Sequence, residues 1–216
     1  MGCCIGSPRR RVYTRLLKRN HIRMKRILLS ALLLGGMMSI ANAQVKKEEL
    51  KTGNAASPEA ETSVTINGKQ IWIFYHAPSV RGRKIFRGAG ALQPDDTVWR
   101  LGADYATVLH TDADLDIGGL AVPKGDYTIY ADLDKGQWKL IVNKQLMAGA
   151  RHIWGINRDG STTNDPATEL GRAALTMGKP ASPVETLKIA LSNSGAKGKL
   201  QVEFENVTAS VPFTVK

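Results

Sequence analysis

The chain has 216 residues and a net charge of +11, from 30 Lys and Arg against 19 Asp and Glu. Nine of the basic residues and none of the acidic ones precede Gln44, so the remaining body has 21 basic and 19 acidic residues and carries about +2. A nearly neutral body lacks the charged surface of a protein that binds nucleic acid. Because the only cysteines are Cys3 and Cys4, the body also has no disulfide, thiol nucleophile or cysteine metal ligand.

Residues 24–43 have the pattern of a secretory signal peptide. A positive start at residues 24–26 is followed by an apolar run from Ile27 and by the small residues Ala41 and Ala43. The run is shorter than the roughly 20 apolar residues that a membrane span needs. We therefore expect cleavage after Ala43, export to the periplasm or the extracellular space, and no membrane span in the mature protein.

The segments on either side of this signal have no strand pattern. Residues 1–23 fit no leader: Gly6 stands where an acylation signal has Ser or Thr, and a charged stretch separates Arg9 and Arg10 from the apolar run. We interpret them as an upstream extension assigned in error, with Met24 as the true start. Residues 44–61 are polar and lack periodicity, which predicts a flexible linker before a single domain at 62–216.

Strand and turn signals then follow one another to the end of the chain. Asn67-Gly68 favours a type I′ hairpin turn, closely spaced turns between 115 and 143 predict an antiparallel meander, and Pro212 suggests an edge strand. The segments with strand patterns are 64–66, 70–76, 106–110, 115–117, 120–122, 127–131, 138–143, 173–177, 186–191, 200–205 and 207–215, and 98–99 is a short apolar stretch after a turn. The sequence thus predicts an all-β fold, an antiparallel β-sandwich of about nine or ten strands, with a jelly roll as one form of it.

The stretch 71–86 holds the best candidate for a site. Apolar residues occupy both alternating sets of positions in 71–76, which predicts a strand buried on both faces, and Pro78 ends it. Arg81, Arg83 and Lys84 follow around Gly82, so a basic bend is expected at the edge of a packed core.

Several separated motifs together resemble one protein family. They are YHAPSVRGRKIF, VWRLGADYATVL, LAVPKGDYTIYADLDKGQWKLIVNK, ELGRAALTM, ETLKIAL and LQVEFEN, in that order between Thr62 and Phe213. They are similar to Y-S-R-P-S-V-K-G-R, V-W-R-T-G-A-N-E-A-T and L-P-A-G-T-Y-S-L-F in a family of exported bacterial proteins described only as a domain of unknown function. His76 and Ala77 depart from the Ser and Arg of that family. The resemblance implies export and a mainly β fold, and it implies no activity.

Basic and aromatic residues near the bend form a candidate ligand site. Its members are His76, Arg81, Arg83, Lys84, Trp99, Arg100 and Trp154. Guanidinium groups bind carboxylate or phosphate through paired donors, and an indole face stacks on a sugar ring. The competing interpretation is a solvated bend with Trp99 in the core and Arg100 bonded to loop carbonyls.

Metal and catalytic motifs are weak. His76, His110 and His152 permit a three-histidine zinc site, but no closely spaced ligand pair supports it, so we expect no metal and no cofactor. Asp112, Asp114 and Asp116 lack the glycine and glutamate of a calcium loop and read as the exposed face of a strand.

The sequence is compatible with two functions. The first is an exported binding or structural module whose basic and aromatic surface takes a small molecule, a glycan or an envelope partner. The second is a hydrolase of an envelope or extracellular substrate with His76 or His110 as base, which requires a histidine beside a carboxylate in a pocket. Whether the protein is an enzyme is left undecided.

Overall fold

The computed structural model describes residues 55–145, 162 and 164–216. The interpretations of residues 1–54, including the signal peptide and the upstream extension, lie outside the described residues, as do His152 and Trp154. In the described part no helix has the length and apolar character needed to span a membrane.

The described residues form thirteen strands in two antiparallel sheets, with one short 3-10 helix, η1 (Pro166–Thr168). The first sheet has the order β1 (Glu59–Ile66), β2 (Lys69–His76), β4 (Thr107–Thr111), β7 (Gly125–Asp132), β8 (Lys139–Asn143) and β9 (Glu169–Ala174), with β3 (Val98–Trp99) paired to β7. The second has the order β11 (Val184–Ser194), β12 (Lys197–Glu205), β13 (Val207–Val215), β5 (Leu115–Ile117) and β6 (Leu120–Val122), with β10 (Thr176–Gly178) paired to β13.

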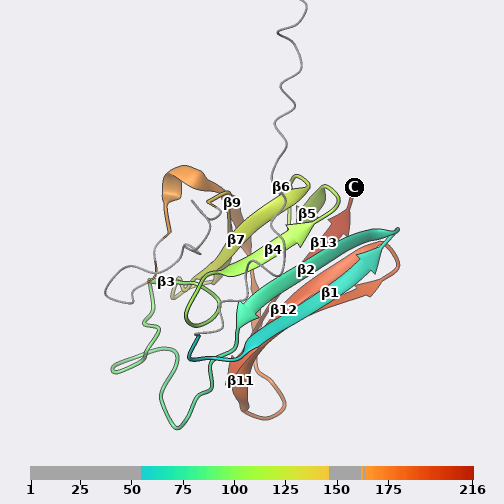
Figure 1. Ribbon diagram of the computed structural model, residues 1–216. Coiled ribbons are helices and arrows are strands. Elements are labelled where there is room, and N and C mark those ends of the chain that lie inside the picture. The colour runs from blue at the N-terminus through green and yellow to red at the C-terminus, as the bar shows by residue number, and fades with distance from the viewer. Residues whose placement is uncertain (1–54, 146–161, 163) are drawn as a thin grey trace, which may run out of the picture. The chain divides into compact units, whose positions relative to one another are not determined.

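The two sheets pack face to face as a sandwich, with β1 and β2 drawn across β11 and β12 (Figure 1). Alternation explains the packing: Leu200, Val202 and Phe204 of β12 are buried and the residues between them are less so. The predicted β-sandwich is therefore confirmed. Strand β2 is buried on both faces as expected, because every residue from Ile71 to His76 is less than 6% exposed.

Three local expectations need correction. Strand β1 begins at Glu59, inside the segment expected to be a linker, because residues 59–61 already pair with β2. The middle of the chain is not one meander, since the β5–β6 hairpin leaves the first sheet and pairs with β13 in the second. Strand β13 is not an edge strand, because it pairs with β12 on one side and with β10 and β5 on the other.

Pro212 is tolerated inside the second sheet for a geometric reason. The amide and carbonyl of a strand residue point to the same side, and the Pro212 carbonyl accepts a hydrogen bond from Gly118. The missing N–H of Pro212 therefore points toward Gly118, beside β5, and away from β12. The ladder between β12 and β13 loses no donor to this proline.

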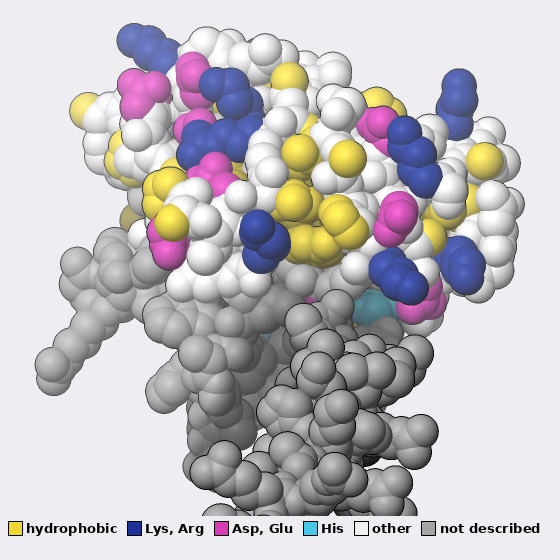
Figure 2. All heavy atoms as spheres, turned by 90° about the horizontal axis from the view of Figure 1, so that it is seen from above, with side chains coloured by type: hydrophobic (Ala, Val, Ile, Leu, Met, Phe, Trp, Pro, Cys, Tyr) yellow, Lys and Arg dark blue, Asp and Glu magenta, His cyan; other side chains and the backbone are white. Residues whose placement is uncertain are grey.

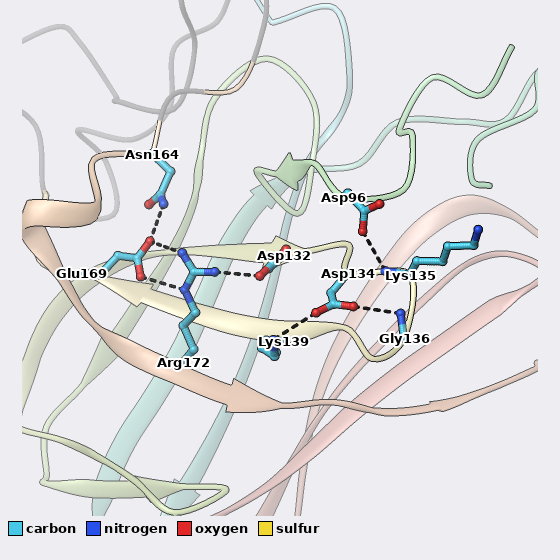
Figure 3. Close-up of polar contacts among 9 residues, drawn as sticks. All are labelled: Asp96, Asp132, Asp134, Lys135, Gly136, Lys139, Asn164, Glu169 and Arg172. Carbon is cyan, nitrogen blue, oxygen red and sulfur yellow. Dashed lines mark hydrogen bonds and ion pairs between the residues drawn. The ribbon is translucent and has the colours of Figure 1, made fainter. Parts of the chain in front are cut away.

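A polar network ties the edge strand β9 to β7 (Figure 3). Arg172 donates from Nε and Nη2 to the two carboxylate oxygens of Glu169, at 2.9 and 2.8 Å, and from Nη1 to Asp132 at 2.7 Å. Asn164 donates to the same Glu169 carboxylate at 2.6 Å. The hydrogen bond from Arg172 is the main reason that the pKa of Glu169 is lowered.

Replacing Arg172 by glutamine is expected to lower the free energy of unfolding by about 1–2 kcal/mol, because the half-buried carboxylates of Glu169 and Asp132 lose the guanidinium group that they share. The loss is moderate because Arg172 is itself partly exposed. Since the pKa of Glu169 is depressed in the folded state, the stability from this group is present above its unfolded pKa and is lost as pH falls through the folded pKa. Urea unfolding at pH 7 and at acidic pH measures both effects. The matched change Lys139→Gln, in an exposed pair with Asp134, should leave the urea midpoint almost unchanged.

Candidate functional site

The basic bend after β2 is a fixed element of the second sheet. The Pro78 carbonyl accepts from Leu187 at 2.9 Å and the Val80 amide donates to the Glu185 carbonyl at 2.7 Å, so the bend pairs with the start of β11. Arg83 donates from Nη2 to the Ser79 carbonyl at 2.6 Å and from Nε to the Val80 carbonyl at 3.0 Å. The guanidinium of Arg83 therefore holds the bend together, whereas Arg81 contributes its backbone amide to a hydrogen bond with the Glu185 carboxylate.

After the bend, two adjacent buried residues are flanked by two exposed basic residues. Ile85 and Phe86 are 3% and 5% exposed and belong to the main core, whereas Lys84 and Arg87 on either side of them are exposed. The backbone here is closed by hydrogen bonds from Leu92 to the Lys84 carbonyl and from Gln93 to the Ile85 carbonyl. These hydrogen bonds and the two buried residues thus anchor the backbone from which the Lys84 and Arg87 side chains project.

A depression of about 280 Å³ opens between three segments that are far apart in the sequence. It is lined by Lys84, Phe86 and Arg87, by Met177 and Gly178 of β10 with Lys179 after it, and by Glu205, Asn206 and Val207 at the β12–β13 turn. We call it the basic depression. Its lining has three basic residues and one acidic residue, Glu205, together with the apolar residues Phe86, Met177 and Val207.

Two charged residues of the basic depression have strained backbones. Arg87 has φ 60° and Glu205 has φ 54°, in the left-handed region that glycine ordinarily occupies. At Gly88 an added Cβ would come within 3.0 Å of Lys84 Nζ, so the glycine leaves room for that ammonium group. Non-glycine residues in this conformation cost about 1 kcal/mol or more and gather at functional sites.

Trp99 lies in the core and offers no exposed face. It is 2% exposed, its ring meets Phe86 edge-on at 5.3 Å and stacks on Phe204 at 6.3 Å, and its Nε1 donates to the Gly102 carbonyl at 3.2 Å. The structure thus agrees with the competing interpretation of this residue. Trp99 supports the basic depression only indirectly, through its contact with Phe86.

The two described histidines lie on the outer face of the first sheet, which we define by the side chains that alternate with the core residues of β2, β4 and β7. Trp72 pairs with His110 across β2 and β4, and His76 is four residues further along β2. Four strand residues span roughly 13 Å, so one zinc ion cannot be bound by both His76 and His110. Within the described ranges no group of at least three His, Cys, Asp or Glu side chains has the arrangement of a metal site.

Both ring nitrogens of His110 contact carboxylates. Nδ1 lies 2.7 Å from Asp126, whose side chain is 5% exposed, and Nε2 lies 3.1 Å from Asp112, which is 40% exposed. The ring stacks on Trp72 with centroids 4.9 Å apart. Burial lowers the pKa of His110, but the hydrogen bonds to Asp126 and Asp112 outweigh this effect and raise the pKa overall. The group is therefore suited to hold a positive charge between two carboxylates.

The charge of Asp104 affects the pKa values of both His76 and Arg100. Burial lowers the pKa of His76, an effect that Asp104 and Glu59 partly oppose. Asp104 also acts on Arg100, which donates to the Thr162 hydroxyl at 3.4 Å and is half-buried. Of the predicted site residues that the structure describes, only Lys84 lines the basic depression, while His76 lies on the outer face and Arg100 follows β3.

The charges on the face shown in Figure 2 are mixed, with Lys and Arg side chains interspersed with Asp and Glu around a group of hydrophobic side chains. Such a face creates no large field of one sign, in keeping with the nearly neutral body. The concentration of cations at the basic depression is therefore a local feature.

Sequence reasoning missed Arg87, Lys179, Glu205 and Asn206. They come together only because β10 and the β12–β13 turn are brought beside the segment after the bend. The available signals were local and weak: a charged residue, Arg87, before Gly88, and Asn206 between the strand patterns that end at Glu205 and begin at Val207.

Comparison with known proteins bears on the family of this chain. No curated protein and no solved structure gives a significant match to it. A family model matches residues 57–213, which confirms the resemblance carried by the motifs. The chain belongs to the family described as "Protein of unknown function (DUF2911)".

Proposed function

We propose that this protein is an exported, non-catalytic binding module whose ligand is a small anion, such as a sugar acid, held in the basic depression. The convergence of Lys84, Arg87 and Lys179 on one hollow of about 280 Å³ supports this function most directly. An anionic group would meet two ammonium groups and one guanidinium fork, and charge-assisted hydrogen bonds of this kind are stronger than neutral ones.

The remaining lining favours a ligand that is more than a bare ion. Phe86, Met177 and Val207 provide an apolar wall, and the Asn206 amide provides a donor and an acceptor. A sugar acid has an apolar ring face, hydroxyl groups and a carboxylate, so it matches these three kinds of surface. The left-handed backbone of Arg87, a basic residue of the lining, fits the same function.

The histidine geometry supports hydrolysis less well than binding. A general base needs a ring nitrogen that can accept a proton from the substrate or its water. Both nitrogens of His110 face carboxylates, and its raised pKa favours the charged form. Burial keeps His76 neutral, but the neighbouring acids act on it through space and no described carboxylate hydrogen-bonds to its ring. We therefore prefer the binding module.

Calorimetric titration of the mature protein with D-galacturonate tests the proposal. Replacing Arg87 by glutamine is expected to weaken binding by about tenfold or more, since one charge-assisted hydrogen-bonding group is lost. Replacing Lys84, Arg87 and Lys179 together should abolish binding, and added salt should weaken it in the native protein. These side chains are exposed, so the urea midpoint should change little.

A triple variant of equal charge change provides the matched control. Lys124→Gln, Lys135→Gln and Lys197→Gln alter exposed lysines that do not line the basic depression, so galacturonate should bind this variant as tightly as the native protein. Uncharged D-galactose should bind far more weakly. Equal binding of galactose, or equal loss of binding in both triple variants, would contradict an anion site at the basic depression.

A further inference from the structure

An anion site alone leaves one residue of the basic depression unexplained. Glu205 lines the hollow together with the basic residues Lys84, Arg87 and Lys179. A carboxylate at this place repels the anion that the three basic residues attract. A depression that served only to hold a bare anion would therefore bind it more tightly without Glu205.

The backbone at Glu205 does not favour a glutamate. Phe204 pairs with Val207, so Glu205 is the first of the two residues that connect this pair across the β12–β13 turn. Its φ is 54°, a conformation that glycine or asparagine ordinarily adopts in a hairpin turn. Glutamate costs about 1 kcal/mol or more there, so turn formation gives no reason for this residue type.

One contact locates the carboxylate of Glu205. Its Oε1 accepts a hydrogen bond from the Ile85 amide at 3.5 Å, and Ile85 lies between Lys84 and Phe86 in the chain. The side chain thus reaches from the β12–β13 turn to the segment after the bend, and both of these line the basic depression. The distance is long for a hydrogen bond, so this contact is a weak one.

Most of the acceptor capacity of this carboxylate is unused in the part of the chain that the structure describes. A carboxylate has two oxygens with about four acceptor positions, and the contact with Ile85 takes one of them. Among the described residues, Glu205 forms no ion pair with Lys84, Arg87 or Lys179, although all four line one hollow. The carboxylate is therefore available to hydrogen-bond donors of a bound molecule.

We propose that Glu205 determines the ligand specificity of the basic depression, by selecting sugar acids with at least two free hydroxyl groups over anions that have none. Two neighbouring hydroxyls donate to the two carboxylate oxygens, while the basic residues bind the acid group of the same ligand. An anion without hydroxyls offers Glu205 no donor and is repelled by it, and specificity is the difference between these two affinities. The inference rests on the proposed anion site and adds the residue that chooses among anions.

Glu205→Gln tests this role with two anions of the same ring size. One is D-galacturonate, and the other is cyclohexanecarboxylate, which has a six-membered ring and a carboxylate but no hydroxyl. Calorimetric titration of the native protein should show tighter binding of galacturonate. In Glu205→Gln, galacturonate should bind about tenfold more weakly, the loss of one charge-assisted hydrogen bond. Cyclohexanecarboxylate should bind this variant at least as tightly as the native protein, because a repulsive charge is removed.

Glu185→Gln is the matched control. Glu185 also accepts from a backbone amide, that of Arg81 at 2.8 Å, but it does not line the basic depression, so both affinities should stay at their native values. Glutamine keeps an oxygen acceptor for the amide in each variant, and the urea midpoints should therefore change little.

The outcomes separate this role from the anion site itself. Galacturonate binding with the same preference over cyclohexanecarboxylate in Glu205→Gln as in the native protein would overturn the role of Glu205 and leave the anion site standing. A lowered urea midpoint with that same unchanged preference would assign Glu205 to the fold. Failure of the native protein to bind either anion would overturn both proposals.

Discussion

Replacing Trp99 by alanine is expected to lower the free energy of unfolding by about 3–5 kcal/mol, the range for truncation of a large aromatic residue in a core. The indole is 2% exposed and contacts Phe86 and Phe204, so its removal leaves a cavity where the two sheets meet. The Gly102 carbonyl also loses its hydrogen bond from Nε1. Urea or thermal unfolding measures the loss.

The variant Trp99→Phe separates the core role of this residue from a role in ligand binding. Phenylalanine retains most of the apolar contact but not the hydrogen bond to Gly102, so the loss should fall to about 1–2 kcal/mol. Galacturonate should bind this variant as it binds the native protein, because Trp99 does not line the basic depression. Weakened binding at unchanged stability would show instead that the indole contacts the ligand.

The strands were predictable because their signals are local. Alternation identified β12, two-sided apolarity identified β2, and Asn67-Gly68 forms its turn with φ 51° and 73°. The pairing of distant strands has no such signal. The β5–β6 hairpin was recognised as a hairpin, but its transfer to the second sheet depends on the partner that β13 offers. Pro212 misled for the same reason, since its tolerance depends on which neighbouring strand its missing N–H faces.

The candidate site was predictable to a smaller extent. The motif at 81–84 drew attention to the bend, and Lys84 does line the basic depression. Neighbouring residues with the same charge have other roles, since Arg83 uses its guanidinium for the carbonyls of Ser79 and Val80. Lys84 Nζ also has one backbone acceptor, the Ala89 carbonyl at 3.5 Å. A sequence shows that a residue is basic, but only the fold shows how many of its donors the backbone beside it already takes. Lys179 lay outside every motif, and Glu205 lay in LQVEFEN, which indicated the family and a strand but no site.

The largest electrostatic effect is expected at His110. Replacing it by leucine should lower the free energy of unfolding at pH 6 by about 3 kcal/mol, because Asp126, which is 5% exposed, loses the imidazolium at 2.7 Å. The double variant His110→Leu with Asp126→Leu should recover much of this loss, since the buried charge is then removed as well. A double-mutant cycle from urea unfolding yields the coupling energy. Asp112→Asn alters the more exposed partner and should cost less than 1 kcal/mol.

The pH dependence of stability distinguishes a charged His110 from a neutral one. Its pKa is raised in the folded state, so its contribution is fully present below the unfolded value of about 6.5 and is lost as pH rises through the folded pKa. The native protein should therefore lose stability above pH 6.5, and His110→Leu should lack that part of the pH profile. Parallel profiles in the two proteins would mean that the ring is neutral when folded. In that case the Asp126 carboxylate would accept a hydrogen bond from the neutral ring of His110, without an ion pair, and His110→Leu should lower the free energy of unfolding by less.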